Sequence, residues 1–402
     1  MADPVVEPSG GGRRTAAAPS LRVEDWARLG IEDLPRDVVL RVVSRLGARQ
    51  LVRTCAVSPR WRDLWRDVPR LNANAPRVRG RERRRLRRAQ PAVQEVFQPP
   101  AAPTGLSEFR LEYSIGPQLI RDCAEANMWI GHALLCNART VEVFAWGDRL
   151  ELGTAVFTSQ RLTRLHFDSA ALRKGFFRQL QTGCHALERL SLKNCAINDG
   201  EISSRTLKVL SIGAECFFVP EDRVSISTPS LIRLGFFDGG LYRQIPLLKN
   251  MQSLETAYIS VGRVESIQVD DIRQFLRGLS GVRKLDFYYV GLEVNMEKNL
   301  LWCPKFYNLQ SLTLSEWCLH AGFYGLIVFL QNSPNLVDLT LKLQGSPEYG
   351  LTGELRDRSF TCRHLNIVQI ICTKPNPVVD SLEKFLLGSG ITSGQIRIKC
   401  KK

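Results

Sequence analysis

Long apolar runs and a signal peptide are both missing from this 402-residue sequence. The densest apolar stretch, Gly325–Leu330, has six residues, far fewer than the ~20 that a membrane-spanning helix needs. Residues 1–12 lack the apolar segment of a secretory signal. We therefore expect a protein that stays inside the cell, in the nucleus or the cytoplasm, with no membrane partner.

Motifs for metal binding, cofactor binding and nucleophilic catalysis are missing as well. The 11 cysteines include no C-x-x-C pair and the five histidines no H-E-x-x-H, so we expect no metal site and mostly buried, reduced thiols. No Gly-rich phosphate loop and no G-x-S-x-G turn occurs. The adjacent pair Cys184–His185 could suggest a nucleophile and its base, but a buried structural cysteine is the preferred interpretation. We predict no catalysis and no cofactor.

Acidic residues are scarce in one short segment, which supplies about half of the formal net charge of +15. Between Arg77 and Arg88 there are eight arginines and one acid, Glu82. The remaining sequence is only mildly basic, so the chain lacks an overall nucleic-acid footprint, and nucleic acid is not the expected partner. A nuclear targeting signal, a plain charged linker and a nucleic-acid contact all fit the run. The targeting candidates are Arg83, Arg84, Arg85, Arg87 and Arg88.

Changes in composition and pattern divide the chain into five parts. They are a disordered tail (1–29), a helical unit (30–71), a linker rich in proline and arginine (72–104), a repeat domain (105–360), and a C-terminal region that ends the repeats (361–402).

The helical unit at 30–71 shows the signals of three short helices. In the first, Asp33 is a candidate cap, Pro35 stands near the start, and apolar residues recur at helical spacing from Val38 to Leu46. Trp61, Leu64, Trp65 and Val68 line one face of the third helix. About 40 residues rarely make a self-sufficient core, and this apolar surface exceeds what the unit covers alone. The excess packs either on another protein or on the rest of the chain, and periodicity alone leaves both open.

From about residue 140 the chain repeats the template L-x-x-L-x-L, followed five positions later by another apolar residue. Successive copies start 20 to 29 residues apart, which is the period of leucine-rich repeats. Full copies start at Leu162, Leu187, Leu207, Leu231, Leu254, Val282 and Leu309, and partial ones at Leu336 and Leu365. An earlier partial copy is Val141, Phe144 and Trp146. Only Cys195 fills the usual Asn/Cys position well, so we predict an irregular horseshoe.

Alternation along each repeat strand predicts which side chains face the concave surface. Apolar template residues point inward, and the residues between them point to the concave side. This surface is cationic in the early repeats and aromatic in the middle, which suits a protein partner, although a solvated face without a role is the alternative. The candidate substrate-binding residues are Arg164, His166, Arg189, Lys193, Arg233, Phe237, Tyr258 and Tyr288.

Two segments resemble known domains. Leu34–Pro35, followed by Val57-Ser-Pro-Arg-Trp61, resembles an F-box, with Pro59 where lysine or arginine is common. His364–Ile370, with 383–387 and 395–398, resembles the FBD-type ending of many plant F-box proteins. Together with the repeats, these segments resemble a plant-type F-box/leucine-rich-repeat protein over about three quarters of the chain.

The resemblance implies an α/β fold in which a small three-helix F-box precedes an irregular leucine-rich-repeat solenoid. It also implies a Skp-type adaptor and, through it, a cullin scaffold as partners, and the role of substrate-recognition subunit of a ubiquitin ligase. The candidates for adaptor docking, or for the helical core behind it, are Leu34, Pro35, Val39, Val42, Leu46, Trp61, Leu64 and Trp65. The alternative is a non-catalytic nuclear scaffold or nucleic-acid-associated protein that uses the arginine run and the repeats.

Overall fold

The computed structural model describes most of the repeat region and part of the helical unit. The described residues are 34–47, 50, 68–74, 106–115, 119–153, 157–213, 215–237, 245–262, 269–289, 303–343, 360, 363–372 and 377–400. The predicted disordered tail and the arginine run lie outside them.

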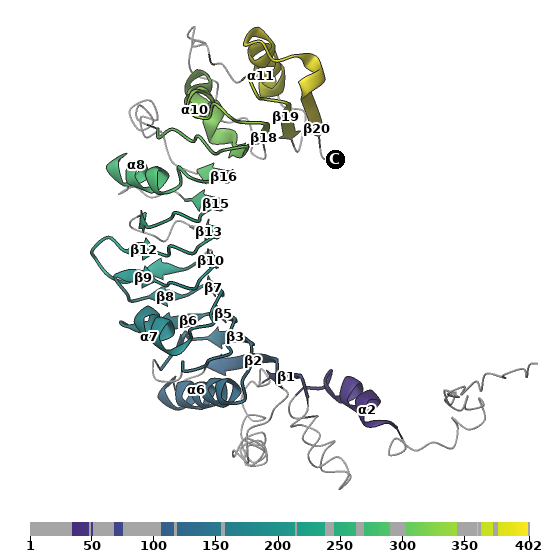
Figure 1. The fold of residues 1–402 in the computed structure, drawn as a ribbon, viewed down its shortest axis with the longest axis vertical. Helices are drawn as coiled ribbons and strands as arrows, with labels where there is room; N and C mark the ends of the chain where they lie inside the picture. Colours follow the sequence, from purple (N-terminus) through teal and green to yellow (C-terminus); the bar gives the residue numbers. More distant parts are fainter. Residues whose placement is uncertain are drawn as a thin grey trace, which may run out of the picture.

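A thirteen-stranded parallel sheet runs through the described residues, and its spatial order follows the sequence (Figure 1). In that order the strands are β1 (Arg70–Asn74), β2 (Glu108–Ile115), β3 (Thr140–Gly147), β5 (Arg164–Asp168), β7 (Arg189–Lys193), β10 (Val209–Ile212), β13 (Arg233–Phe237), β15 (Thr256–Val261), β16 (Lys284–Tyr289), β17 (Ser311–Ser315), β18 (Asp338–Leu343), β19 (Ile367–Cys372) and β20 (Ile396–Cys400). The sheet bends into an arc with these strands along its inner side (Figure 1).

Helices and short strands cover the outer side of the arc (Figure 1). The helices of the sheet region are α6 (Leu119–Leu135), α7 (Phe176–Gly183), α8 (Val269–Gly278), α10 (His320–Gln331) and α11 (Pro377–Gly388), with the 3-10 turns η5 (Glu316–Leu319) and η6 (Ser393–Gln395). One short sheet holds β4 (Leu150–Glu151), β6 (Ala170–Leu172), β8 (Ala196–Ile197) and β11 (Phe217–Phe218). Another holds β9 (Glu201–Ser203), β12 (Ser225–Ser227) and β14 (Leu247–Lys249). The fold is mixed α/β, as the sequence predicted.

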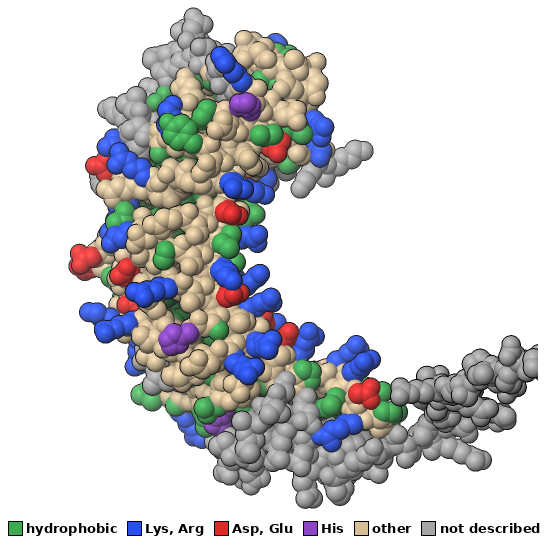
Figure 2. All heavy atoms as spheres, in the orientation of Figure 1, with side chains coloured by type: hydrophobic (Ala, Val, Ile, Leu, Met, Phe, Trp, Pro, Cys, Tyr) green, Lys and Arg blue, Asp and Glu red, His purple; other side chains and the backbone are tan. Residues whose placement is uncertain are grey.

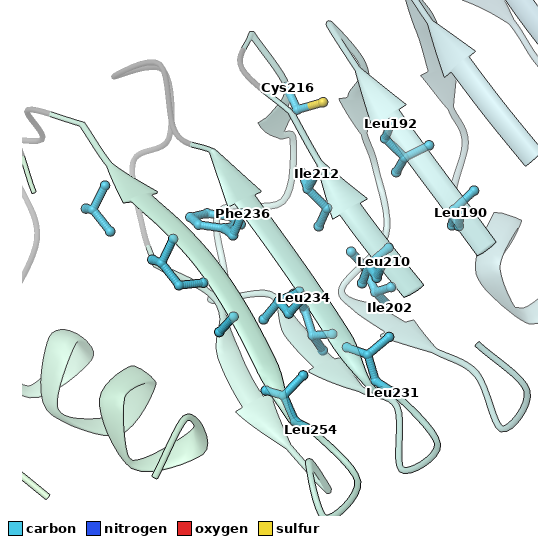
Figure 3. Packing of buried hydrophobic residues seen from close by; sticks show 14 of the residues in the cluster. Leu190, Leu192, Ile202, Leu210, Ile212, Cys216, Leu231, Leu234, Phe236 and Leu254 are labelled. Carbon is cyan, nitrogen blue, oxygen red and sulfur yellow. The ribbon is translucent and has the colours of Figure 1, made fainter. Parts of the chain in front are cut away.

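The core lies between the main sheet and this outer layer, and the repeated template residues build it. Leu190, Leu210 and Leu234 are register partners on β7, β10 and β13, and each is at most 1% exposed. Their side chains point to the same side of the sheet (Figure 3). Because neighbouring parallel strands place equivalent residues side by side, the sequence repeat becomes a continuous apolar row.

The predicted partial copy at Val141, Phe144 and Trp146 is wrong in its register. On β3 the buried residues are Val141, Val143 and Ala145, whereas Phe144 and Trp146 face the opposite side. Val141 pairs with Leu165, which is the fourth position of its own repeat, not the first. The repeat template picked Phe144 because it lies three residues after Val141 and is bulky. In a strand, however, side chains alternate every second residue, and this alternation decides which of them are buried.

The helical unit joins the sheet through its first helix, α2 (Arg36–Val43). Pro35, rather than the predicted Asp33, occupies the N-cap position, and its carbonyl accepts hydrogen bonds from the N–H groups of Val38 and Val39 at 3.0 and 3.1 Å. A fixed proline φ suits this position at a helix start.

The strand β1 crosses the predicted boundary between residues 71 and 72. It pairs with β2 over five residues, from Arg70 opposite Glu108 to Asn74 opposite Glu112. Gly47 also forms a parallel bridge with Asn72. The start of the predicted linker is therefore part of the sheet, directly beside the end of the first helix.

Candidate protein-binding surfaces

Helix α2 has two apolar faces with different surroundings. Val39 and Val43 are 5% and 3% exposed and belong to the core cluster. Val38 and Val42 lie on the other side of the helix and are 37% and 52% exposed. The spacing of the valines explains this division, because residues four apart share a helix face. The exposed pair is a small apolar patch next to the sheet.

The sequence did not divide the adaptor-docking candidates between docking residues and core residues. The structure separates several of them. Val39 is a core residue, and Leu34 and Leu46 are partly buried against the core. Val42 and Pro35 are exposed. The remaining candidates lie outside the described residues: Trp61, Leu64 and Trp65.

All eight substrate-binding candidates lie on one face of the main sheet, on β5, β7, β13, β15 and β16. Along each strand they alternate with buried template residues. The first strand positions form one row across the sheet, from Arg164 to Arg189, Val209 and Arg233. Lysine and arginine side chains gather along the inner edge of the arc (Figure 2). The predicted candidates therefore form a single surface.

Two cations on this surface, Lys193 and Arg110, are held by neighbouring acids. Lys193 lies 3.1 Å from the Asp168 carboxylate on the adjacent strand, and that hydrogen bond raises the pKa of Lys193. Arg110 pairs with Glu112 at 3.0 Å and with Glu142 at 3.5 Å. Such exposed pairs contribute little to stability, about 0 to 1 kcal/mol each, but they neutralise the surface locally.

Three arginines of the first row are different. Arg164, Arg189 and Arg233 are exposed, and within the described part of the chain their guanidinium groups form no ion pair or hydrogen bond. In the next row the hydroxyl groups of Ser191 and Ser211, which are register partners, also form no hydrogen bond to described residues.

The middle of the surface is aromatic. The ammonium groups of Lys284 and Lys342 lie 5.6 and 5.1 Å from the ring centroids of Tyr258 and Tyr288, and Lys342 also donates a hydrogen bond to the Tyr288 hydroxyl. Phe237 is 38% exposed, and its ring lies against Gly235, two residues earlier on the same strand. A Cβ added at Gly235 would lie 3.0 Å from that ring. A side chain at Gly235 would therefore require the Phe237 ring to shift by a few tenths of an ångström.

Sequence reasoning missed an aromatic and ionic cluster at the start of the sheet. The Arg110 guanidinium lies 4.2 Å from the centroid of the Phe144 ring, and the His166 ring is 5.0 Å from it. The misread register of β3 hid this cluster. The alternation of Val141, Val143 and Ala145 was the signal that could have shown it.

The other sequence expectations concern catalysis, metals and membranes. Burial raises the pKa of Cys184 to about 11, so this thiol is a poor nucleophile beside His185. The part of the chain that the structure covers contains no group of three metal-ligating side chains. Its helices are all too short or too polar to span a membrane.

Comparison with known proteins identifies the N-terminal unit and the whole-chain type. Residues 31–72 match the family model of the F-box domain. The MEIOTIC F-BOX protein MOF of Oryza sativa subsp. japonica is 26% identical, over 89% of this chain and 83% of its own length. An FBD-associated F-box protein of Arabidopsis thaliana is 25% identical, over 77% of this chain and 76% of its own. A putative F-box/LRR-repeat protein of Arabidopsis thaliana is 24% identical, over 84% and 68%.

The chain contains an F-box domain and is similar over most of its length to plant F-box/LRR-repeat and FBD-associated F-box proteins. The predicted resemblance is confirmed, and one of the relatives that match the chain is named as an FBD-associated F-box protein. A substrate-recognition role goes with the F-box. F-box domains generally bind Skp1-type adaptors, and F-box/LRR proteins are generally non-catalytic adaptors of ubiquitin ligase complexes.

Proposed function

We propose that this plant-type F-box protein is the substrate-recognition subunit of a Skp–Cullin–F-box ubiquitin ligase. The F-box docks on a Skp-type adaptor, and the curved sheet acts as a leucine-rich-repeat horseshoe that holds a protein substrate on its inner face. The observation that carries this proposal is the F-box match at 31–72, whose first helix keeps Val38 and Val42 exposed while Val39 and Val43 pack into the core.

The direct join between helix and sheet supports this division of labour. Because Gly47 bridges to Asn72 and Val43 is in the core, an adaptor bound to α2 has a defined position relative to the inner face. Catalysis by such a subunit is proximity. It raises the local concentration of substrate lysines near the conjugating enzyme and contributes no reacting group.

Localisation in the nucleus, the cytoplasm or both belongs to the proposal. The nuclear-targeting candidates lie outside the described residues. They belong to the arginine run, on which the alternative function as a nuclear scaffold also depends. Nothing in the described part of the chain favours that alternative over substrate recognition.

The test is a pull-down of the full-length chain with a purified Skp-type adaptor at low and high salt. An apolar contact predicts binding that survives high salt. Val38→Asp with Val42→Asp should abolish it, because two charges would be buried in the interface. The matched control is Ile120→Asp on α6, which changes an 88% exposed apolar residue elsewhere and should leave binding intact. Adaptor binding by the folded double variant would overturn the docking assignment, and absence of binding by the wild-type chain would overturn the proposed function.

A further inference from the structure

The three arginines of the first row, which have no partner among the described residues, occupy a bounded stretch of the inner face. Arg164, Arg189 and Arg233 lie on β5, β7 and β13, with Val209 on β10 between the last two. Three strand spacings separate the first arginine from the last, or about 14 Å. Unpaired guanidinium groups this close repel one another, so the row favours an anionic partner.

Acids bound this cationic stretch on both sides. Toward the N-terminus, β2 and β3 carry Glu112 and Glu142, both paired with Arg110. Toward the C-terminus, Asp286 on β16 has a buried carboxylate oxygen without a hydrogen-bond partner among the described residues, and Asp338 on β18 is exposed. A short anionic segment matches the length of the arginine row, whereas a long polyanion such as a nucleic acid would extend beyond it, over strands whose charges are paired or acidic.

The floor beside the arginines offers polar and apolar contacts suited to a peptide. Ser191 and Ser211 present two hydroxyl groups that bond to no described residue, in the neighbouring row and next to Gly235 in register. The exposed ring of Phe237 covers that glycine and can pack against an apolar side chain.

The length of the stretch matches alternate side chains of an extended peptide. Consecutive residues of an extended chain advance ~3.3 Å, so acids at positions i, i+2 and i+4 span about 13 Å. Guanidinium groups are well suited to carboxylates because they bind them with paired, charge-assisted hydrogen bonds.

We propose that Arg164, Arg189 and Arg233 bind a short extended segment of the substrate protein that is rich in aspartate and glutamate. The inference rests on the proposed function for its biological setting, but it concerns the inner face alone. The acidic side chains contact the three arginines, and the peptide lies over Ser191 and Ser211 with an apolar residue on Phe237.

Binding of a labelled peptide to the full-length chain tests the proposal. The probe is a fluorescein-labelled octapeptide of alternating glutamate and alanine, and its neutral counterpart has glutamine in place of glutamate. Fluorescence anisotropy should show that the acidic peptide binds and that the neutral one binds at least about tenfold more weakly. Equal binding of the two peptides would overturn the proposal.

Charge reversal locates the site. The triple variant Arg164→Glu, Arg189→Glu and Arg233→Glu should lose the acidic peptide. The control triple, Arg121→Glu, Arg178→Glu and Arg277→Glu, makes the same change in net charge on exposed residues of the outer helices α6, α7 and α8 and should keep it. Equal loss in both triples would show only a general charge effect and would overturn the assignment.

Two further readouts separate this inference from its rivals. The first is binding of a twelve-nucleotide single-stranded RNA. If the wild-type chain binds this RNA more tightly than the acidic peptide, and the inner-face triple variant does not bind it, the proposed peptide ligand would be rejected in favour of nucleic acid. Binding of the Skp-type adaptor should be unchanged in the inner-face triple. An intact adaptor interaction together with no peptide binding by the wild-type chain would refute the inference and leave the proposed function standing.

Discussion

Gly47 and Asn72 form a parallel β-bridge that joins the end of the first F-box helix to the first strand of the sheet. Val39, Val43 and Val68 are part of the same core cluster as the strand residue Leu71. The F-box helix therefore shares its hydrophobic core with the repeats. Loosening that core should disturb the helix and the strand together.

Val43→Ala should lower the free energy of unfolding by about 2 kcal/mol, because it removes buried methyl groups at a 3% exposed position. Hydrogen exchange should become faster in both α2 and β1, since they open as one unit. The matched change Val42→Ala, at a 52% exposed position one residue earlier, should leave exchange and stability nearly unchanged. Faster exchange confined to α2 would contradict a shared core.

The repeat strands were predictable because their period is visible in the sequence. Leu190, Leu192, Leu210 and Ile212 occupy the same two template positions in successive copies, and all are buried. The residues of the concave face were predictable because side chains alternate between the two faces along each strand. The first helix was predictable from its valines, although the division between Val39 and Val42 needed the position of the sheet.

The ion pairs of the inner face could not be predicted from the sequence. Lys193 is neutralised by Asp168 because β5 and β7 place these two residues opposite each other. Arg189, at the start of the same strand as Lys193, faces Arg164 and stays unpaired among the described residues. Repeat lengths and registers decide such neighbours, and they vary from copy to copy. The misread register of Phe144 has the same origin.

Gly183→Ala should destabilise the repeat region. Gly183 ends α7, and a Cβ there would lie 2.0 Å from the carbonyl oxygen of Phe157, a backbone atom that cannot move aside easily. The Gly183 carbonyl also accepts a hydrogen bond from the N–H of Ser159 at 2.8 Å, so the two segments are held close. We expect a loss of at least about 1 to 3 kcal/mol, measured by urea unfolding.

Gly388→Ala is the matched control for that substitution. Gly388 also ends a helix, α11, but a Cβ added there would have no described atom within 4 Å. Alanine at this position should be neutral or stabilising by up to about 1 kcal/mol, because it restricts the unfolded chain. Similar losses in the two variants would show that the contact with Phe157 is not the cause.

His166 makes the stability of the inner face depend on pH. Burial lowers the pKa of His166 below its ordinary value of 6.5. Glu142 and Asp168 oppose this shift, whereas Lys193 and Arg110 reinforce it. The neutral imidazole is therefore favoured in the folded protein. The unfolded chain takes up a proton more readily, so folding stability is fully present above about pH 6.5 and decreases as the pH falls through the lowered pKa.

His166→Gln should reduce this acid sensitivity. The urea midpoint of the wild-type chain should fall between pH 7.5 and pH 5.5, and the fall should be smaller in the variant. It should not vanish, because burial also lowers the pKa of His132. The control His185→Gln alters an exposed histidine and should keep the wild-type slope. The slope is the decisive quantity, because loss of the contact with Phe144 lowers the midpoint at every pH. An unchanged slope in His166→Gln would mean that this imidazole does not contribute to the acid sensitivity.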